Sequence, residues 1–180
     1  PKRFFEKFSF NKKKRRQGKL VWFHCSSVGE LLSVVPLIQE FEKKKKIKQI
    51  LVTTSTLSSS KIFNKFIFKK TLHQFYPLDN THIVNNFLNH WKPSSVIFVE
   101  SEIWPTMISC LKSRKIKVIL LNARMSEKSF RRWSSFKYFG KNIFEKFNYI
   151  FPQNKETFSY FKKLGINKLK FLGNLKFVST

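Results

Sequence analysis

The segment Ser26-Ser27-Val28-Gly29-Glu30 holds the side chains best suited to chemistry in this sequence. It separates two apolar runs, which predicts a strand, a tight turn and the start of a helix. The spacing of Ser27 and Glu30 is that of a capping box, in which both side chains bond to free amides of the first helical turn. A carboxylate that leaves the cap can instead take a proton from a substrate hydroxyl, and we expect the helix end to keep Glu30 ionised at neutral pH. Gly29 would allow a substrate close to the backbone.

Further polar side chains follow three later apolar runs. They are Thr53, Thr54, Ser55 and Thr56 after the second run, Glu100 and Glu102 after the fourth, and Arg124 after the fifth. Carboxylates suit sugar hydroxyls, hydroxyl groups suit phosphate or sugar oxygens, and an arginine can hold a phosphate through two hydrogen bonds. Helix caps, ordinary turns and a surface ion pair explain the same residues without a ligand. Their convergence on one edge of a sheet nevertheless predicts a site for a polar, anionic ligand.

Short apolar runs alternate with helical patterns along most of the chain. Strands are expected at residues 20–25, 47–53, 72–76, 95–99, 116–121, 149–151 and 169–172, with helices between them. The stripe of Ile62, Phe63, Phe66 and Ile67 predicts one of these helices. Pro36 either kinks the first helix or marks where it becomes regular, and Gly140 is expected to divide a long helical region in two. The alternation predicts an α/β, Rossmann-like open parallel sheet with helices on both faces.

The chain is strongly basic, with 36 Lys and Arg against 10 acidic residues and a net charge of +26. Nucleic acid, an anionic membrane face or an anionic substrate could each bind such a basic surface. Compositional bias that fills exposed faces with Lys would explain the charge without a partner. Residues 1–18 combine basic and aromatic side chains, which suits a membrane-proximal segment or, alternatively, a solvated tail. We expect residues 19–180 to form one domain. The start at Pro1 indicates an excised piece of a longer protein.

Several classes of site have no support in the sequence. Cys25 and Cys110 form no C-x-x-C pair, and the four histidines lack H-E-x-x-H spacing, so no metal is expected. Helix-turn-helix, RNP and zinc patterns are not found, which argues against nucleic acid as a partner. The glycine fingerprint of a dinucleotide-binding turn is also missing, and no cofactor is predicted.

Five ordered motifs resemble the N-terminal half of the Kdo (3-deoxy-D-manno-octulosonic acid) transferases, glycosyltransferase family 30. In order, the motifs stand at Trp22–Glu30, Leu51–Thr56, Glu100–Pro105, Asn122–Ser126 and Gly173–Lys176. The resemblance implies half of a GT-B glycosyltransferase that transfers Kdo from CMP-Kdo to lipid A precursor (lipid IVA) without a metal. It also implies that the enzyme works at the cytoplasmic face of the bacterial inner membrane, on an anionic surface.

The same resemblance assigns roles to individual residues. Glu30 corresponds to the proposed general base, and Glu100 looks like a second essential acid. The acceptor-binding residues would be Ser27, Gly29, Thr53, Thr54, Glu102, Trp104 and Arg124, with Asn174 and Lys176 on the donor side. The family's C-terminal, donor-binding domain would follow Thr180, so the chain alone is expected to be inactive. A GT-B enzyme with another acceptor and a basic nucleic-acid-binding domain stay open as alternatives.

Overall fold

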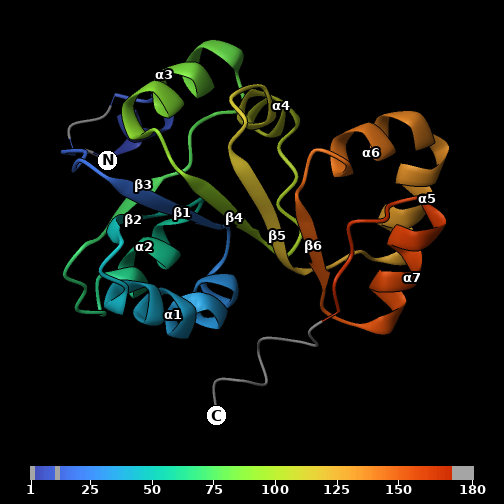
Figure 1. The fold of residues 1–180 in the computed structure, drawn as a ribbon, viewed down its shortest axis with the longest axis horizontal. Coiled ribbons are helices and arrows are strands. Elements are labelled where there is room, and N and C mark those ends of the chain that lie inside the picture. Colours follow the sequence, from blue (N-terminus) through green and yellow to red (C-terminus); the bar gives the residue numbers. More distant parts are fainter. Residues whose placement is uncertain (1–2, 11–12, 172–180) are drawn as a thin grey trace.

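A computed structural model describes residues 3–10 and 13–171 of the chain (Figure 1). Its centre is a parallel sheet of six strands in the order β3-β2-β1-β4-β5-β6. The strands are β1 (Lys19–Cys25), β2 (Ile47–Thr54), β3 (Thr71–Phe75), β4 (Ser95–Val99), β5 (Lys117–Ala123) and β6 (Tyr149–Pro152). The order first runs outward from β1 to β3 and then restarts beside β1 with β4. The point between β1 and β4 is therefore where the chain reverses its direction of winding.

Helices cover both faces of the sheet, as the alternating pattern predicts. They are α1 (Val28–Lys43), α2 (Leu57–Phe63), α3 (Thr81–Trp91), α4 (Pro105–Ser113), α5 (Glu127–Ser135), α6 (Lys137–Phe144) and α7 (Lys155–Lys163). One core cluster joins α1 and α2 to the sheet, and the other joins α3, α4, α6 and α7 to the opposite face (Figure 1). The predicted fold class is confirmed.

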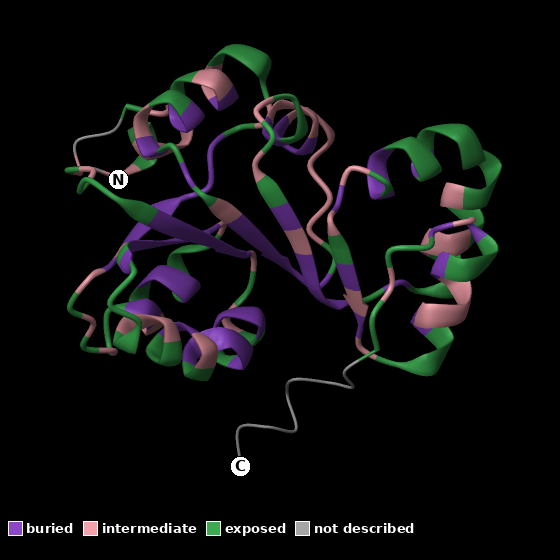
Figure 2. Cartoon of the chain, in the orientation of Figure 1, coloured by how far each residue is buried: buried purple, intermediate pink, exposed green. Residues whose placement is uncertain are grey.

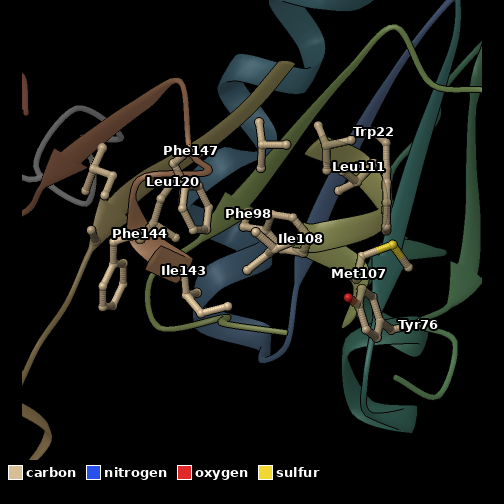
Figure 3. Packing of buried hydrophobic residues seen from close by; sticks show 14 of the residues in the cluster. Trp22, Tyr76, Phe98, Met107, Ile108, Leu111, Leu120, Ile143, Phe144 and Phe147 are labelled. Atoms are coloured by element: carbon tan, nitrogen blue, oxygen red, sulfur yellow. The ribbon is translucent and has the colours of Figure 1, made fainter. Parts of the chain in front are cut away.

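Strands near the centre of the sheet are almost continuously apolar because both of their faces are covered. Trp22 of β1 and Phe98 of β4 are fully buried and pack near Tyr76, Met107 and Leu111 in the larger cluster (Figure 3). The sheet is largely buried, whereas the outward faces of the helices are exposed (Figure 2). This rigid layer fixes the strand ends from which the candidate site is built.

Some element boundaries differ from the sequence predictions. The helix expected around 62–67 lies earlier, because Thr56 caps it through the amide of Ser59 and it ends at Phe63. Ile67 lies beyond it and is 97% exposed. The strand expected at 169–172 is reduced, among described residues, to a single bridge between Leu169 and Ile150.

Two residues that often break helices behave differently from each other. The break in the long helical region falls at Phe136, whereas Gly140 lies buried inside α6 against the ring of Trp133, so the prediction of a break at Gly140 is wrong. A side-chain carbon at position 140 would lie 3.1 Å from that ring, a tight contact that gives the glycine a packing role. Pro36 lies inside α1, which continues through it.

The described parts of segment 1–18 pack against the rest of the fold. Residues Phe4–Phe8 form a 3₁₀ helix, η1, in which the carboxylate of Glu6 accepts the amide of Phe75 on edge strand β3 at 2.8 Å. Arg3 pairs with Glu6 and reaches Nδ1 of His73 at 2.7 Å. Burial, followed by the charges of Arg3 and Lys13, lowers the pKa of His73 to about 3 and keeps its ring neutral. The described residues are thus anchored by specific bonds, and their proximity to a membrane stays a prediction.

Within the described residues, no helix combines the length and apolar character needed to span a bilayer.

Candidate active site

The candidate site lies at the carboxyl edge of β1 and β4, where the winding direction reverses. Neighbouring strands that wind away from each other leave a crevice there, and ligands of open α/β sheets bind in it. Glu30 enters from the turn after β1, and Glu100 and Glu102 enter from the segment after β4. Three carboxylates that are distant in sequence therefore meet at this edge.

Glu30 lies in the first turn of α1 and is only 8% exposed. Its carboxylate accepts the amide of Ser26 at 2.7 Å and the hydroxyl of Ser27 at 3.0 Å, while its own amide donates to the Ser27 oxygen at 3.2 Å. The predicted capping box is confirmed, although the carboxylate reaches the amide of Ser26 rather than that of the capping residue Ser27. These bonds hold the carboxylate in the first turn of α1, directly after the end of β1.

The ionisation of Glu30 differs from the sequence expectation. Burial, reinforced by the charges of Glu102 and Glu100, raises the pKa of Glu30 to about 7, although the bonds from Ser26 and Ser27 oppose that rise. The expectation that the helix end alone keeps this group ionised at neutral pH is therefore wrong. A carboxyl group that titrates near neutrality is a stronger base than an ordinary glutamate once it is ionised.

Glu102 is held by a buried network that the sequence did not reveal. One of its oxygens accepts Nε2 of His24 at 3.0 Å and Nε1 of Trp104 at 2.7 Å. The ring of His24 stacks on Tyr76 at 3.9 Å between centroids, and its Nδ1 contacts the Thr53 hydroxyl at 3.0 Å. Burial acts to raise the pKa of Glu102, but the bonds from His24 and Trp104 and the His24 charge bring it below the usual value. Glu102 therefore stays ionised beside Glu30.

His24 is the residue that sequence reasoning missed. It lies at the end of an apolar strand, where a single histidine is more often a core residue than a functional one. The available signal was its position directly before Cys25 and the Ser26–Glu30 segment. Only the pairing of β1 with β2 and β4 shows that it joins Thr53 to Glu102.

Glu100 adopts a left-handed backbone conformation, with φ of 61°, although it is not a glycine. Its amide donates to the carbonyl of Leu121 at 2.9 Å, and its own carbonyl accepts the amide of Arg124 at 3.4 Å. Such conformations cost of order 1 kcal/mol or more and cluster at functional sites. The tie between β4 and β5 holds Glu100 at the crevice, where its charge contributes to the raised pKa of Glu30.

Thr53 and Thr54 are fully buried, unlike the other predicted acceptor-binding residues. The hydroxyl of Thr53 accepts Nε1 of Trp22 at 2.8 Å, and that of Thr54 contacts Nε2 of His73 at 2.9 Å. Both hydroxyls are thus bonded within the protein and do not face the open crevice. The structure gives them a supporting position beneath the site.

A cavity of about 160 Å³ opens next to Glu100. Ser101 and Arg124 line one side of it, and Arg132 and Trp133 of α5 line another. Among described residues, neither arginine forms an ion pair. The structure therefore brings the predicted Arg124, together with Arg132, to a cavity that Glu100 also lines.

The structure says less about the other residues that were predicted to bind the acceptor or the donor. Trp104 is half-buried and caps α4, and Gly29 has no atom within 4 Å of the position where a side chain would start. Asn174 and Lys176 lie outside the described residues. Among the described residues, no group of three or more His, Cys, Asp and Glu side chains is arranged to hold a metal ion.

Comparison with known proteins decides the family. The family model for 3-deoxy-D-manno-octulosonic-acid transferase (kdotransferase) matches residues 2–179. This chain belongs to the Kdo transferase family. A Kdo transferase from Rickettsia bellii is 36% identical over 178 residues, which cover 99% of this chain and 42% of the relative. A probable mitochondrial Kdo transferase from Arabidopsis thaliana is 41% identical over 133 residues, or 74% of this chain and 30% of the relative.

The chain thus spans less than half the length of these Kdo transferases. Among solved structures, UDP-N-acetylglucosamine 2-epimerase from Rickettsia bellii has a TM-score of 0.61 and 17% identity, covering 89% of this chain and 46% of that one. The corresponding epimerase from Neisseria meningitidis, solved with bound UDP-GlcNAc, has a TM-score of 0.57 and 15% identity, covering 88% of this chain and 47% of that one. At these identities the likeness shows a shared fold.

Proposed function

We propose that this chain is the acceptor-binding part of a glycosyltransferase that moves Kdo from CMP-Kdo to a hydroxyl of lipid A precursor. The observation that carries the proposal is the meeting of Glu30 with Glu100 and Glu102 at the carboxyl edge of β1 and β4, where burial and the two neighbouring charges raise the pKa of Glu30 to about 7. The family match supports Kdo as the sugar that is transferred.

In this proposal Glu30 is the general base. Its ionised carboxylate takes the proton of the acceptor hydroxyl while that oxygen forms a bond to the sugar carbon and the bond between Kdo and CMP breaks. Glu102, fixed by His24 and Trp104, orients acceptor hydroxyls and keeps a negative charge near Glu30. Glu100 is the second acid, and its place beside Arg124 suits a ligand that has both hydroxyls and an anionic group.

Other parts of the proposal rest on the family match. Donor binding would fall to the part of the relatives that this chain does not cover, and the family motif assigns Asn174 and Lys176 to the donor side. The transfer would need no metal, so a chelator should leave activity unchanged. The enzyme would work at the cytoplasmic face of the inner membrane, where its lipid acceptor is held.

The test is Glu30→Gln in the longer protein that includes this chain. We expect transfer to fall by about 10²–10⁴-fold, because a glutamine cannot accept the proton. Far-ultraviolet circular dichroism and acceptor binding should be unchanged. Glu40→Gln is the matched control, because Glu40 is exposed on the same helix and pairs with Lys43 at the surface. Near-normal turnover of Glu30→Gln would exclude Glu30 as the base.

A further inference from the structure

The junction of α5 and α6 exposes three aromatic side chains in a short stretch. Phe136, Tyr138 and Phe139 are 67%, 95% and 52% exposed. The buried face of α6 is formed by Gly140, Ile143 and Phe144, so these rings lie on other faces of the helix. We call residues 133–141 the elbow. Scattered exposed apolar residues are ordinary, but a contiguous group of aromatic side chains marks an interaction surface.

The charge around the elbow is mainly positive. Residues 127–145 contain five basic and two acidic residues, a net charge of +3. Both acids are already engaged, Glu127 with Arg131 and Glu145 with Lys141, in exposed pairs on the helix surface. Lys128, Arg132 and Lys137 form no ion pair within the described part of the chain. An aromatic surface with unpaired basic residues complements an anionic one.

The outer surfaces of α5 and α6, the two helices that carry the elbow, are mostly exposed to solvent. None of the residues of α5 is buried, and α5 and α6 stand out beyond edge strand β6 with mostly exposed surfaces (Figure 2). Aromatic rings beside Lys and Arg are typical of helices that lie in the interface of a bilayer, with the rings at the headgroup level.

The elbow is continuous with the cavity at the candidate site. The ring of Trp133 stacks on Phe139, with centroids 6.2 Å apart and planes 16° apart, and the same tryptophan lines the cavity. Arg132 and Glu100 line that cavity as well.

We propose that the elbow docks this protein on an anionic lipid bilayer. Phe136, Tyr138 and Phe139 enter the boundary between headgroups and acyl chains, while Lys137, which forms no ion pair among the described residues, contacts anionic headgroups. The proposal deepens the proposed function, since it names the surface through which a lipid acceptor arrives. It places the main contact on α5 and α6 rather than on residues 1–18.

The test is flotation of this chain with phosphatidylcholine vesicles that contain or lack phosphatidylglycerol. We expect the combined change Phe136→Ser, Tyr138→Ser and Phe139→Ser to reduce the partition coefficient at least about tenfold, because the buried apolar area is lost. The matched control is Phe4→Ser, Phe5→Ser and Phe10→Ser, which removes three exposed aromatic side chains in and directly after η1 and should have a much smaller effect. Lys137→Glu should weaken binding only to vesicles that contain phosphatidylglycerol.

Unfolding midpoints in urea are measured for every variant, and Tyr138→Ser alone is used if the triple variant does not fold. Three outcomes would overturn the proposal. The first is that the elbow variant floats as well as the parent chain. The second is that the parent chain does not bind vesicles but self-associates, and that the elbow variant no longer self-associates. The third is that the parent chain does not bind vesicles but retains single-stranded RNA, and that the elbow variant no longer retains it. Vesicle binding requires no sugar donor, so failure here leaves the proposed transfer intact, and failure of Glu30 as base leaves vesicle binding intact.

Discussion

At the scale of single residues, the environment of Glu30 outweighs its position in the helix. A carboxylate in the first turn of a helix is ordinarily stabilised in its charged form. Here burial and the neighbouring charges of Glu102 and Glu100 favour the protonated form more strongly. His24 and Trp104 contribute indirectly, because their bonds keep Glu102 ionised.

This raised pKa predicts a dependence of stability on pH. The pKa of Glu30 is about 7 in the folded chain against an ordinary 4.5, so the folded state binds more protons between these values. The contribution of Glu30 to stability is therefore fully present below about pH 4.5 and is lost as the pH rises through about 7. Glu30→Gln removes this loss, and we expect it to be more stable than the parent chain at pH 8 by about 2 kcal/mol.

Urea denaturation of both chains at pH 8 and pH 5 measures the effect. The advantage of the variant should shrink at pH 5, since the parent chain then has Glu30 largely protonated. An equal difference at the two pH values would show that Glu30 titrates normally.

At the scale of elements, two helical glycines differ in how much space surrounds the position of a side chain. Gly29 of α1 has free space around the position of a side chain, whereas a side-chain carbon at Gly140 of α6 would lie 3.1 Å from the ring of Trp133. Helix propensity disfavours glycine at both positions. The structure therefore explains Gly140 by packing and leaves Gly29 to be explained by the approach of a ligand.

Alanine at each position separates the two explanations. Gly29→Ala should stabilise the chain by about 0.5 kcal/mol because it lowers the entropy cost of the helix. Gly140→Ala should bring a smaller gain than Gly29→Ala, or a net loss, because the ring of Trp133 must move by a few tenths of an ångström and this cost opposes the same gain in helix propensity. Midpoints of urea unfolding give both values. In the longer enzyme Gly29→Ala should also reduce transfer despite its greater stability, and full activity would mean that no substrate passes close to that backbone.

At the scale of the whole molecule, unbalanced charge is the dominant property. The net charge of +26 leaves most basic side chains without an acidic partner, and repulsion among them opposes the compact state. The buried sheet and its two core clusters must offset this repulsion.

Screening should therefore stabilise the fold. We expect the thermal midpoint to rise by several degrees when NaCl is increased from about 0.02 M to about 0.5 M, because the Debye length falls well below the spacing of surface lysines. Differential scanning fluorimetry measures the midpoint, and sodium sulfate at matched ionic strength separates screening from specific anion binding. A midpoint that falls with NaCl would mean that the ion pairs contribute more than the repulsion costs.

The sequence alone determined the order of strands and helices, the fold class and the positions of Glu30, Glu100, Glu102 and Arg124 at one sheet edge. It succeeded because these features depend on local periodicity and on the rule that parallel strands end at the same edge. The five ordered motifs likewise identify the family without the tertiary structure.

The tertiary structure decided what depends on contacts between distant segments. It placed His24 between Thr53 and Glu102, buried Thr53 and Thr54 beneath the site, and moved the helix break from Gly140 to Phe136. The pKa of Glu30 belongs to the same class, since it depends on burial and on two carboxylates about 70 residues away in the chain. No local pattern carries this information, because electrostatic and packing energies depend on distances in space rather than on separation along the sequence.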